Sequence, residues 1–348
     1  MIKLSKSKVT TSAIATKLGL ARSTVSMALR NHPAINEKTR SRVRRTADKL
    51  GYMPNDIAQA MVTGKTRVIG FLVDQPDREH VSRMLNGVLE AADEQGFYVK
   101  IIRSYDPSGI TDLVKRCVSQ RLAGAICLNF SEPSLEQLQH SFNSYGIPIA
   151  ILASSFEHPR ATRVISDDVI GVRQAIDHLV ALGHRHIAHI CGVTYSGSMA
   201  LRRKGFEQAM TDHGLWSPDQ LPLPIHHTAN MNEVEAATRD MLADASNRPT
   251  AIFCATDSIA MVVTRTARSM GLRLPEDLSI VGFANLNLAE LADPPLTTVS
   301  QPFNEMGQTV IKQLIPQIKK LDRKVLTPSC HTLPTQLIIR QSTTIPNK

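Results

Sequence analysis

The side chains with the most suggestive chemistry lie near the N-terminus, in residues 22–30 (RSTVSMALR). At helical spacing, Val25, Ala28 and Leu29 share one apolar face. The opposite face carries guanidinium, hydroxyl and thioether groups, from Arg22, Ser23, Ser26 and Met27. Guanidinium and hydroxyl groups donate hydrogen bonds to phosphate oxygens and to the edges of bases. This face is therefore a candidate surface for nucleic acid.

The positive charge of the chain is concentrated in the same region. Residues 1–65 contain thirteen Lys and Arg side chains and three acidic ones, Glu37, Asp48 and Asp56. The whole chain has 40 basic and 31 acidic side chains, with a net charge of +9, so the remainder is close to neutral. This asymmetry indicates a basic head that contacts a polyanion and a body with another task.

Two more helices are expected to position this face. Residues 10–19 predict a short helix with Ile14 and Leu18 inward, and Asn36 is a good N-cap for a third helix that ends at Gly51. Two helices joined by a turn and braced by a third form a helix-turn-helix unit, whose second helix enters the major groove. A small basic bundle with a solvated face is the alternative that charge and periodicity leave open.

A short segment connects the head to the rest of the chain. Residues 56–62 could form about two helical turns, too few for a helix that is stable alone in water. Met61 would be an apolar group near the end of this helix. Beside a DNA-reading module it could insert into a minor-groove base step. Packing of Met61 on the body is the alternative.

Residues 67–340 alternate short apolar runs with amphipathic helices, and the pattern restarts after RVISDD (163–168). Repeated βα winding predicts parallel sheets covered on both faces, here in two halves with a ligand cleft between them. The expected boundaries are head 1–53, hinge 54–66 and body 67–348. The first half of the body would be 67–165 plus 301–328, and the second 166–298 plus 329–340.

Other residue clusters argue against catalysis, metals and membranes. The five cysteines are far apart and mostly in apolar runs, which predicts buried free thiols. On a strand, His184 and His186 share a face that His189 does not, so we expect no metal site. Phosphate-loop, dinucleotide and nucleophile-elbow motifs are absent, so we expect no enzyme and no cofactor. Without a long apolar run or a signal peptide, we expect a cytoplasmic protein with no membrane contact.

Residues 9–73 resemble the head and hinge of the lactose/galactose repressor family, chiefly through the segments TVS-x-A-L, EKTR and GY-x-PN-x-x-A. The resemblance implies that Arg22, Ser23 and Met27 face base edges. It implies phosphate contacts for Thr10, Thr24, Ser26, Asn31 and Thr39. It also places Asn55, Ala58, Gln59 and Met61 along a hinge helix in the minor groove, with Met61 where the family usually has Leu.

The body resembles the effector domain of the same family at HLVALGHRHIAHICG, RRKGFEQAM and PTAIFCATDSIAM. The implied fold is an all-α helix-turn-helix head with a hinge helix, followed by a periplasmic-binding-protein-like α/β domain of two doubly wound parallel-sheet halves. Arg202 matches an effector-binding arginine, although spacing alone favours a surface residue. Asp257 either caps the following helix or contacts ligand. The weaker cleft candidates are Thr256, Asn285, Gln301 and His80.

Departures from the family pattern carry further expectations. Met27 replaces a common Arg and would change one base preference per half-site, because a thioether makes only apolar contacts. Ala21 replaces a Ser that would cap the second helix, a loss of about 1 kcal/mol. Ala153 and Ala284 stand where the family often has Asp. Fewer carboxylates around Arg202 would favour an anionic effector, either a sugar acid or a phosphorylated metabolite.

The resemblance implies a ligand-responsive repressor of carbohydrate or sugar-acid genes that binds a palindromic double-stranded operator as a homodimer in the cytoplasm, at the bacterial nucleoid. A solute-binding or sugar-converting protein with an incidental basic head is the alternative. Salt-dependent binding to a palindromic duplex separates the two.

Overall fold

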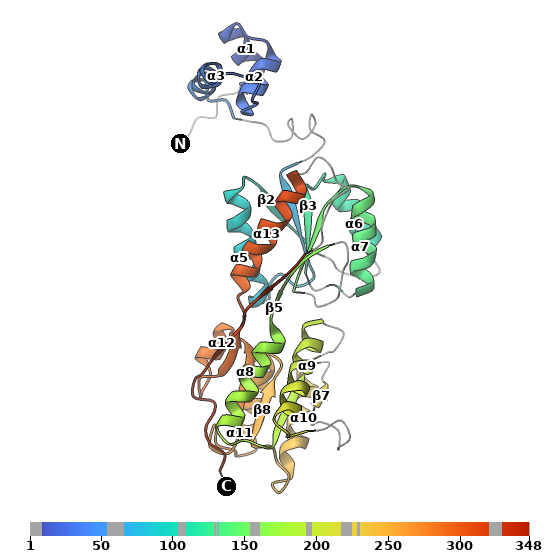
Figure 1. The fold of residues 1–348 in the computed structure, drawn as a ribbon, viewed down its shortest axis with the longest axis vertical. Helices are drawn as coiled ribbons and strands as arrows, with labels where there is room; N and C mark the ends of the chain where they lie inside the picture. Colours follow the sequence, from blue (N-terminus) through green and yellow to red (C-terminus); the bar gives the residue numbers. More distant parts are fainter. Residues whose placement is uncertain are drawn as a thin grey trace. The chain divides into compact units, whose positions relative to one another are not determined.

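The structure is a computed structural model. It describes residues 9–53, 66–103, 109–128, 130, 132–153, 161–192, 197–216, 225–227, 230–319 and 329–347. The chain divides into two compact units, Met1–Thr66 and Arg67–Lys348 (Figure 1). The residues expected in the hinge helix, Asn55, Ala58, Gln59 and Met61, lie outside the described residues.

The first unit contains the three helices predicted from periodicity: α1 (Thr11–Leu18), α2 (Arg22–Leu29) and α3 (Glu37–Leu50). Their inward faces form one small core, made of Ile14, Ala15, Val25, Ala28, Val43 and Ala47. The Asn36 side chain caps α3 by accepting from the backbone N–H of Thr39 at 2.8 Å. Helix α2 begins after Ala21 without a side-chain cap, as the Ser-to-Ala departure predicts.

The first half of the second unit is a six-stranded parallel sheet in the order β11-β5-β4-β3-β1-β2. Its strands are β1 (Val68–Val73), β2 (Tyr98–Arg103), β3 (Gly124–Leu128), β4 (Ile149–Leu152), β5 (Thr162–Ser166) and β11 (Cys330–Leu333). One face is covered by α5 (Glu79–Glu94) and α13 (Phe303–Lys319), the other by α6 (Ile110–Ser119) and α7 (Glu132–Ser144) (Figure 1).

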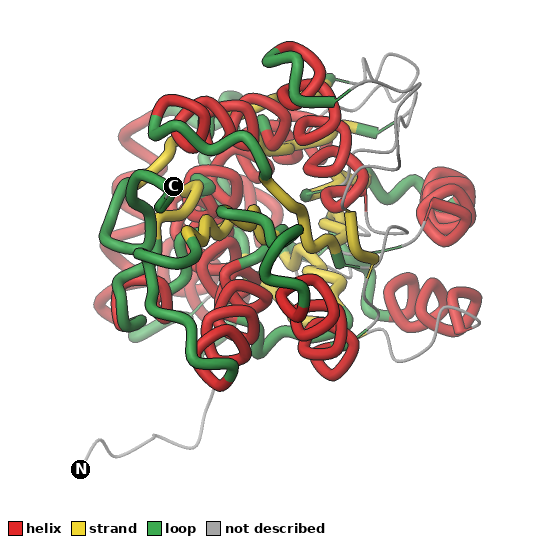
Figure 2. The backbone as a smooth tube through the Cα atoms, turned by 90° about the horizontal axis from the view of Figure 1, so that it is seen from below, coloured by secondary structure: helices red, strands yellow, loops and turns green. Residues whose placement is uncertain are grey.

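The second half is another six-stranded sheet, in the order β12-β10-β9-β8-β6-β7. Its strands are β6 (Ile187–Cys191), β7 (Ile225–His227), β8 (Ala251–Cys254), β9 (Ser279–Ala284), β10 (Thr297–Ser300) and β12 (Gln336–Ile338), which is antiparallel to β10. Its helices are α8 (Asp168–Ala181), α9 (Gly197–Asp212), α10 (Met231–Ala243), α11 (Asp257–Ser269) and α12 (Asn287–Leu291). Figure 2 shows strands flanked by helices, as the winding pattern predicts.

The chain crosses between the two halves after β5, after β10 and after β11 (Figure 1). The expected boundary at residue 329 is wrong for Cys330–Leu333, because this strand pairs in parallel with β5 in the first sheet. Only Gln336–Ile338 joins the second sheet. Both strands are short and partly exposed, so their own residues carry little signal for one sheet or the other. Their positions depend on which sheet edges are free to pair with them.

Four of the five cysteines are buried free thiols, as predicted, and Cys330 is exposed. Within the described part of the chain, none of the helices is long and apolar enough to span a membrane.

Candidate nucleic-acid interface and effector site

Helix α2 turns its predicted base-reading side chains away from the core of the head. Val25 and Ala28 are buried, Arg22 and Ser23 are exposed, and Met27 is half-buried. The head core therefore holds the apolar face of α2 and leaves the opposite face for a partner. Its arginine and hydroxyl groups suit phosphates and base edges, while the Met27 thioether offers only apolar contact.

Three of the five predicted phosphate contacts lie at helix ends. The Thr10 hydroxyl caps α1 by accepting from the Ala13 N–H at 3.4 Å, and Thr39 lies in the first turn of α3. Asn31 is exposed and follows α2 in the left-handed region, with φ of 58°. Helix N-termini carry free N–H groups that favour anions.

Two predicted phosphate contacts on α2 itself are partly enclosed. Thr24 is half-buried, and the Ser26 hydroxyl accepts from the Arg30 guanidinium at 2.5 Å. Ser26 would therefore have to share its hydroxyl oxygen between Arg30 and a phosphate.

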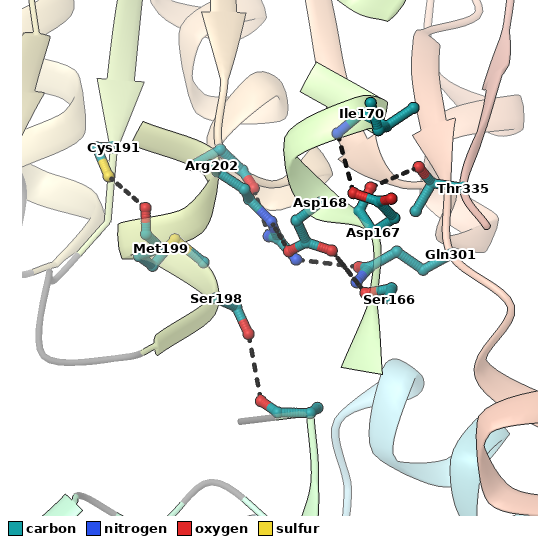
Figure 3. Close-up of polar contacts among 12 residues, drawn as sticks. Ser166, Asp167, Asp168, Ile170, Cys191, Ser198, Met199, Arg202, Gln301 and Thr335 are labelled. Carbon is teal, nitrogen blue, oxygen red and sulfur yellow. Dashed lines mark hydrogen bonds and ion pairs between the residues drawn. The ribbon is translucent and has the colours of Figure 1, made fainter. Parts of the chain in front are cut away.

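In the body, Arg202 of α9 is buried, with 5% of its side chain exposed, so the surface alternative that spacing favours is wrong. Its Nε donates to Asp168 Oδ2 at 2.9 Å and its Nη2 to Gln301 Oε1 at 3.1 Å (Figure 3). Its Nη1 donates to the Ala255 carbonyl oxygen at 2.6 Å. The Phe283 ring lies 4.0 Å from the guanidinium carbon. Every donor atom of the guanidinium group thus has a partner, and the side chain is held rigidly.

The network around Arg202 lies where the chain crosses between the halves. Gln301 Nε2 donates to Ser166 Oγ at 2.7 Å and to Asp168 Oδ1 at 3.2 Å, and the Ser166 hydroxyl donates to Asp168 Oδ1 at 2.5 Å (Figure 3). Ser166 ends β5 and Gln301 follows β10, so the network joins two of the three crossings. Any relative movement of the halves must strain or rearrange these bonds.

The sequence predicted Arg202 and Gln301 but missed Asp168 and Ser166. A signal was present, because the ISDD segment follows an apolar run and precedes a helix, where ligand-binding groups gather at the carboxyl end of a strand.

The start of α11 is capped by Thr256 and not by Asp257, for which a capping role was one of two expectations. The cap is Thr256, whose hydroxyl accepts from the Ile259 N–H at 3.2 Å. Asp257 has no exposed surface; it accepts from the Leu286 N–H at 2.7 Å and from the Thr298 hydroxyl at 2.5 Å. Burial raises the pKa of this carboxyl group. The prediction that Asp257 caps α11 is therefore wrong. Its carboxyl group instead binds the segment that follows β9, through the N–H of Leu286.

Asn285 lies in that segment, and its conformation is strained. Ala284 and Asn285 have φ of 119° and 53°, a region that costs non-glycine residues about 1–3 kcal/mol. The segment is held by Arg340, which donates to Asn285 Oδ1 at 2.9 Å, and by Arg83, which donates to the Asn285 carbonyl oxygen at 2.8 Å.

Arg83 is part of a polar bridge between the halves that we call the clasp, made of Glu79, Arg83, Asn285 and Asn287. Arg83 Nη2 donates to Asn287 Oδ1 at 2.7 Å and pairs with Glu79 at 2.6 Å, while Glu79 Oε1 accepts from the Asn287 N–H at 2.8 Å. Glu79 and Arg83 belong to α5 of the first half, and the asparagines to the second. Sequence reasoning missed the clasp, since its members lie about two hundred residues apart.

His80 lies beside the clasp at the start of α5, with its ring centroid 6.0 Å from that of Phe303. Burial, with the nearby charges of Arg78 and Arg202, lowers the pKa of His80 to about 4. The imidazole is therefore neutral at neutral pH and available as a hydrogen-bonding group rather than as a cation.

The lowered pKa of His80 predicts a pH-dependent stability. Between pH 6.5 and 4 the unfolded chain binds a proton at His80 and the folded chain does not, so acidification through this window favours unfolding. From pH 7 to 5 the loss should be about 2 kcal/mol. Denaturant unfolding at both pH values should show a smaller loss in His80→Gln than in the wild type. Equal losses in the two proteins would contradict this assignment.

The histidines considered for a metal have structural roles or separate positions. His184 contacts the Thr250 hydroxyl and the Thr344 carbonyl oxygen, each at 2.9 Å, and His189 contacts the Phe253 carbonyl oxygen. His186 is exposed. Among the described residues, no group of three His, Cys, Asp or Glu side chains is arranged to hold a metal ion.

A helix-turn-helix head followed by a two-lobed α/β body defines a class, the ligand-responsive bacterial transcription regulators. Residues 10–55 match the model of the bacterial regulatory proteins of the lacI family, and residues 176–343 match the periplasmic binding protein-like domain. The chain is 32% identical over 342 residues to the HTH-type transcriptional regulator DegA of Bacillus subtilis, covering 97% of this chain and 98% of DegA. It belongs to the lacI family.

Other similar proteins are regulators of the same kind. The HTH-type transcriptional repressor PurR of Aliivibrio fischeri is 28% identical over 315 residues, covering 89% of this chain and 92% of PurR. The lac repressor dimer bound to operator and the anti-inducer ONPF has a TM-score of 0.79 at 25% identity and covers 97% of this chain and 100% of its own. The CelR–cellobiose complex has a TM-score of 0.71 at 25% identity, with 96% and 100% covered. These findings confirm the fold class and a DNA-binding, effector-responsive transcription regulator. The similar proteins are themselves transcription regulators rather than enzymes.

Proposed function

We propose that this regulator binds a palindromic operator as a homodimer and represses genes of carbohydrate or sugar-acid metabolism, in the cytoplasm at the nucleoid. The observation that carries the proposal is the outward face of α2, with Arg22 and Ser23 exposed opposite the buried Val25 and Ala28. Two such heads on a symmetric dimer require inverted half-sites. The similar lac repressor structure is a dimer on its operator, which supports this arrangement.

The test is a selection of random duplexes with the full-length chain. We expect two inverted half-sites, two chains per duplex and an affinity that falls steeply with salt. A protein that selects no duplex but binds a small metabolite would contradict the proposal and favour a solute-binding role.

Within this proposal, the hinge residues Asn55, Ala58, Gln59 and Met61 form a conditional helix in the central minor groove. A helix of about two turns is marginal in water, so a small change in the body can decide whether it forms. Met61 acts as the apolar wedge.

The effector that we propose is a small anion, either a sugar acid or a phosphorylated metabolite, bound beside Arg202. Its carboxylate or phosphate would offer the guanidinium a stronger acceptor than the neutral amide oxygen of Gln301. The positive charges of Arg78 and Arg202, which lower the pKa of His80, also support an anionic effector. So do Ala153 and Ala284, which stand where the family often has a carboxylate. His80, Thr256 and Asn285 are the neighbouring candidates for contacts to its hydroxyl groups, while the buried Asp257 supports the segment that carries Asn285.

Isothermal titration with matched pairs tests the effector class: gluconate against glucose, galacturonate against galactose, and glucose 6-phosphate. We expect binding heat only with an anion. Tight binding of a neutral sugar, with no response to any acid, would overturn this part of the proposal while leaving the DNA-binding role intact.

Met27→Arg should change the preferred base at one symmetric position of the operator. A guanidinium group pairs with guanine O6 and N7, which a thioether cannot do, and such a contact discriminates by about 1–3 kcal/mol. The duplex selection described above, repeated with the variant, measures this. The same motif from both proteins would show that position 27 does not read a base.

A further inference from the structure

A row of cations runs along the outer side of α3, separate from the predicted base-reading face. We call it the α3 stripe: Lys38, Arg42, Arg45 and Lys49, spaced i, i+4, i+7 and i+11, which places them on one helix face. Ser41 and Thr46 add hydroxyl groups, and the six residues line a depression of 460 Å³. At 1.5 Å per residue the stripe is about 16 Å long.

The charge of the α3 stripe is not neutralised within the described head. The two acidic residues of α3, Glu37 and Asp48, lie on another side of the helix, and Glu37 pairs with Arg40 at 3.2 Å. Arg42 donates to the Leu18 carbonyl oxygen at 3.2 Å, which ties it to the end of α1. Among the described residues, no carboxylate forms an ion pair with any of the four stripe cations. Four like charges on one face repel each other unless an anion lies against them.

The α3 stripe and the α2 reading face point in different directions. Helix α3 packs on α1 and α2 through Val43 and Ala47, which are buried in the head core with Val25 and Ala28. The stripe lies on the far side of α3 from these residues, and Arg22 and Ser23 lie on the far side of α2. We therefore expect a duplex on the α2 face to reach at most the first turn of α3, where Thr39 lies, and to leave Arg45 and Lys49 uncovered.

We infer that the α3 stripe is a second phosphate-binding surface, which holds a stretch of duplex DNA other than the half-site read by α2. The inference rests on the proposed function for the operator complex. Each strand presents one phosphate per about 3.4 Å of axis, so a stripe of about 16 Å faces several of them. The residues lining the depression include no aromatic or large apolar side chain, the anchors that a protein partner needs. A uniform polyanion fits this surface better.

The test is capture of a second duplex by the protein–operator complex. Full-length protein is loaded on bead-bound operator, excess protein is washed away, and a fluorescent duplex without operator sequence is added at about 50 mM salt. Because both α2 faces of each dimer are occupied by operator, only another surface can retain this duplex. We expect the second duplex to be retained. Its log affinity should fall with log salt concentration by a slope of about 0.9 for each phosphate contact.

Two variants with equal charge change make the test specific. The stripe variant Lys38→Gln/Arg45→Gln/Lys49→Gln should retain at least fivefold less of the second duplex than the wild type. Its affinity for operator should stay within about threefold of wild type. The slope of log affinity for the second duplex against log salt concentration should be lower by about 2.7. The body variant Lys115→Gln/Lys204→Gln/Lys312→Gln should retain the duplex like the wild type. Arg42 is kept, because it contacts Leu18.

Three results would overturn the inference: no retention by wild-type protein on bound operator, equal retention by the stripe variant, or retention of poly-glutamate but not of DNA, which would point to an acidic protein. Failure to select any operator at all would instead contradict the proposed function, so the two failures are distinguishable.

Discussion

Arg202→Leu should lower the free energy of unfolding of the body by about 3–5 kcal/mol, because it leaves the Asp168 carboxylate buried without its cation. Asp168 is 2% exposed and receives the Arg202 Nε–H at 2.9 Å. The substitution also removes the donors to Gln301 and to the Ala255 carbonyl oxygen, so the crossings between the halves lose a shared anchor. Denaturant unfolding measures the change in stability.

Two controls separate the buried charge from general damage to α9. Arg203→Leu removes an arginine next in the chain that is exposed and paired with Glu207, and should cost less than about 1 kcal/mol. Arg202→Leu/Asp168→Leu removes both charges and should recover much of the lost stability. Only the variants lacking Arg202 should also lose the response of operator binding to effector. Wild-type stability in Arg202→Leu would show that the pair does not hold the body together.

Gly87→Ala and Gly307→Ala should each destabilise the first half of the body by about 3 kcal/mol, the upper part of the usual range for overpacked cores. A Cβ at Gly87 would lie 1.9 Å from the Asn304 carbonyl oxygen, and one at Gly307 would lie 2.1 Å from the Met84 carbonyl oxygen. These neighbours are backbone atoms of the opposite helix, which cannot rotate away. Either methyl group must therefore separate α5 from α13.

Separation of these helices should also affect the site. Helix α5 carries Glu79 and Arg83 of the clasp, and α13 follows Gln301 of the Arg202 network. We expect weaker effector binding along with the lower stability. Gly192→Ala is the matched control, since the atom nearest to its Cβ would be the Met199 sulfur at 3.4 Å, which belongs to a flexible side chain. Gly192→Ala should change the free energy of unfolding by less than about 1 kcal/mol. An equally small change in Gly87→Ala and Gly307→Ala would refute the close approach of the two helix backbones.

The head could be predicted in detail because its determinants are local. Ile14, Val25, Ala28, Val43 and Ala47 recur at helical spacing within each segment, and all are buried in one core. Asn36 and the left-handed Gly51 bound α3 as expected. The longer strands of the body could also be predicted, because strands buried on both faces appear in the sequence as continuous apolar runs such as GAICL.

The short strands were harder to predict, for a different reason. Strand β11 is exposed and partly exposed in alternation, and β12 has only three residues, so neither carries a strong apolar signal. Each forms because a sheet edge offers it hydrogen bonds: β11 pairs with β5, and β12 pairs with β10. That edge exists only after the rest of the sheet has folded.

The basic head, the outward chemistry of α2 and the two α/β halves follow from the amino-acid sequence alone, since charge, helical spacing and apolar runs act between near neighbours. The tertiary structure alone decided that Arg202 is buried against Asp168, that the clasp joins α5 to residues 285–287, and that β11 completes the first sheet. Such contacts join residues tens to hundreds of positions apart. Their energies come from desolvation and from shared hydrogen bonds, which exist only once distant segments have met.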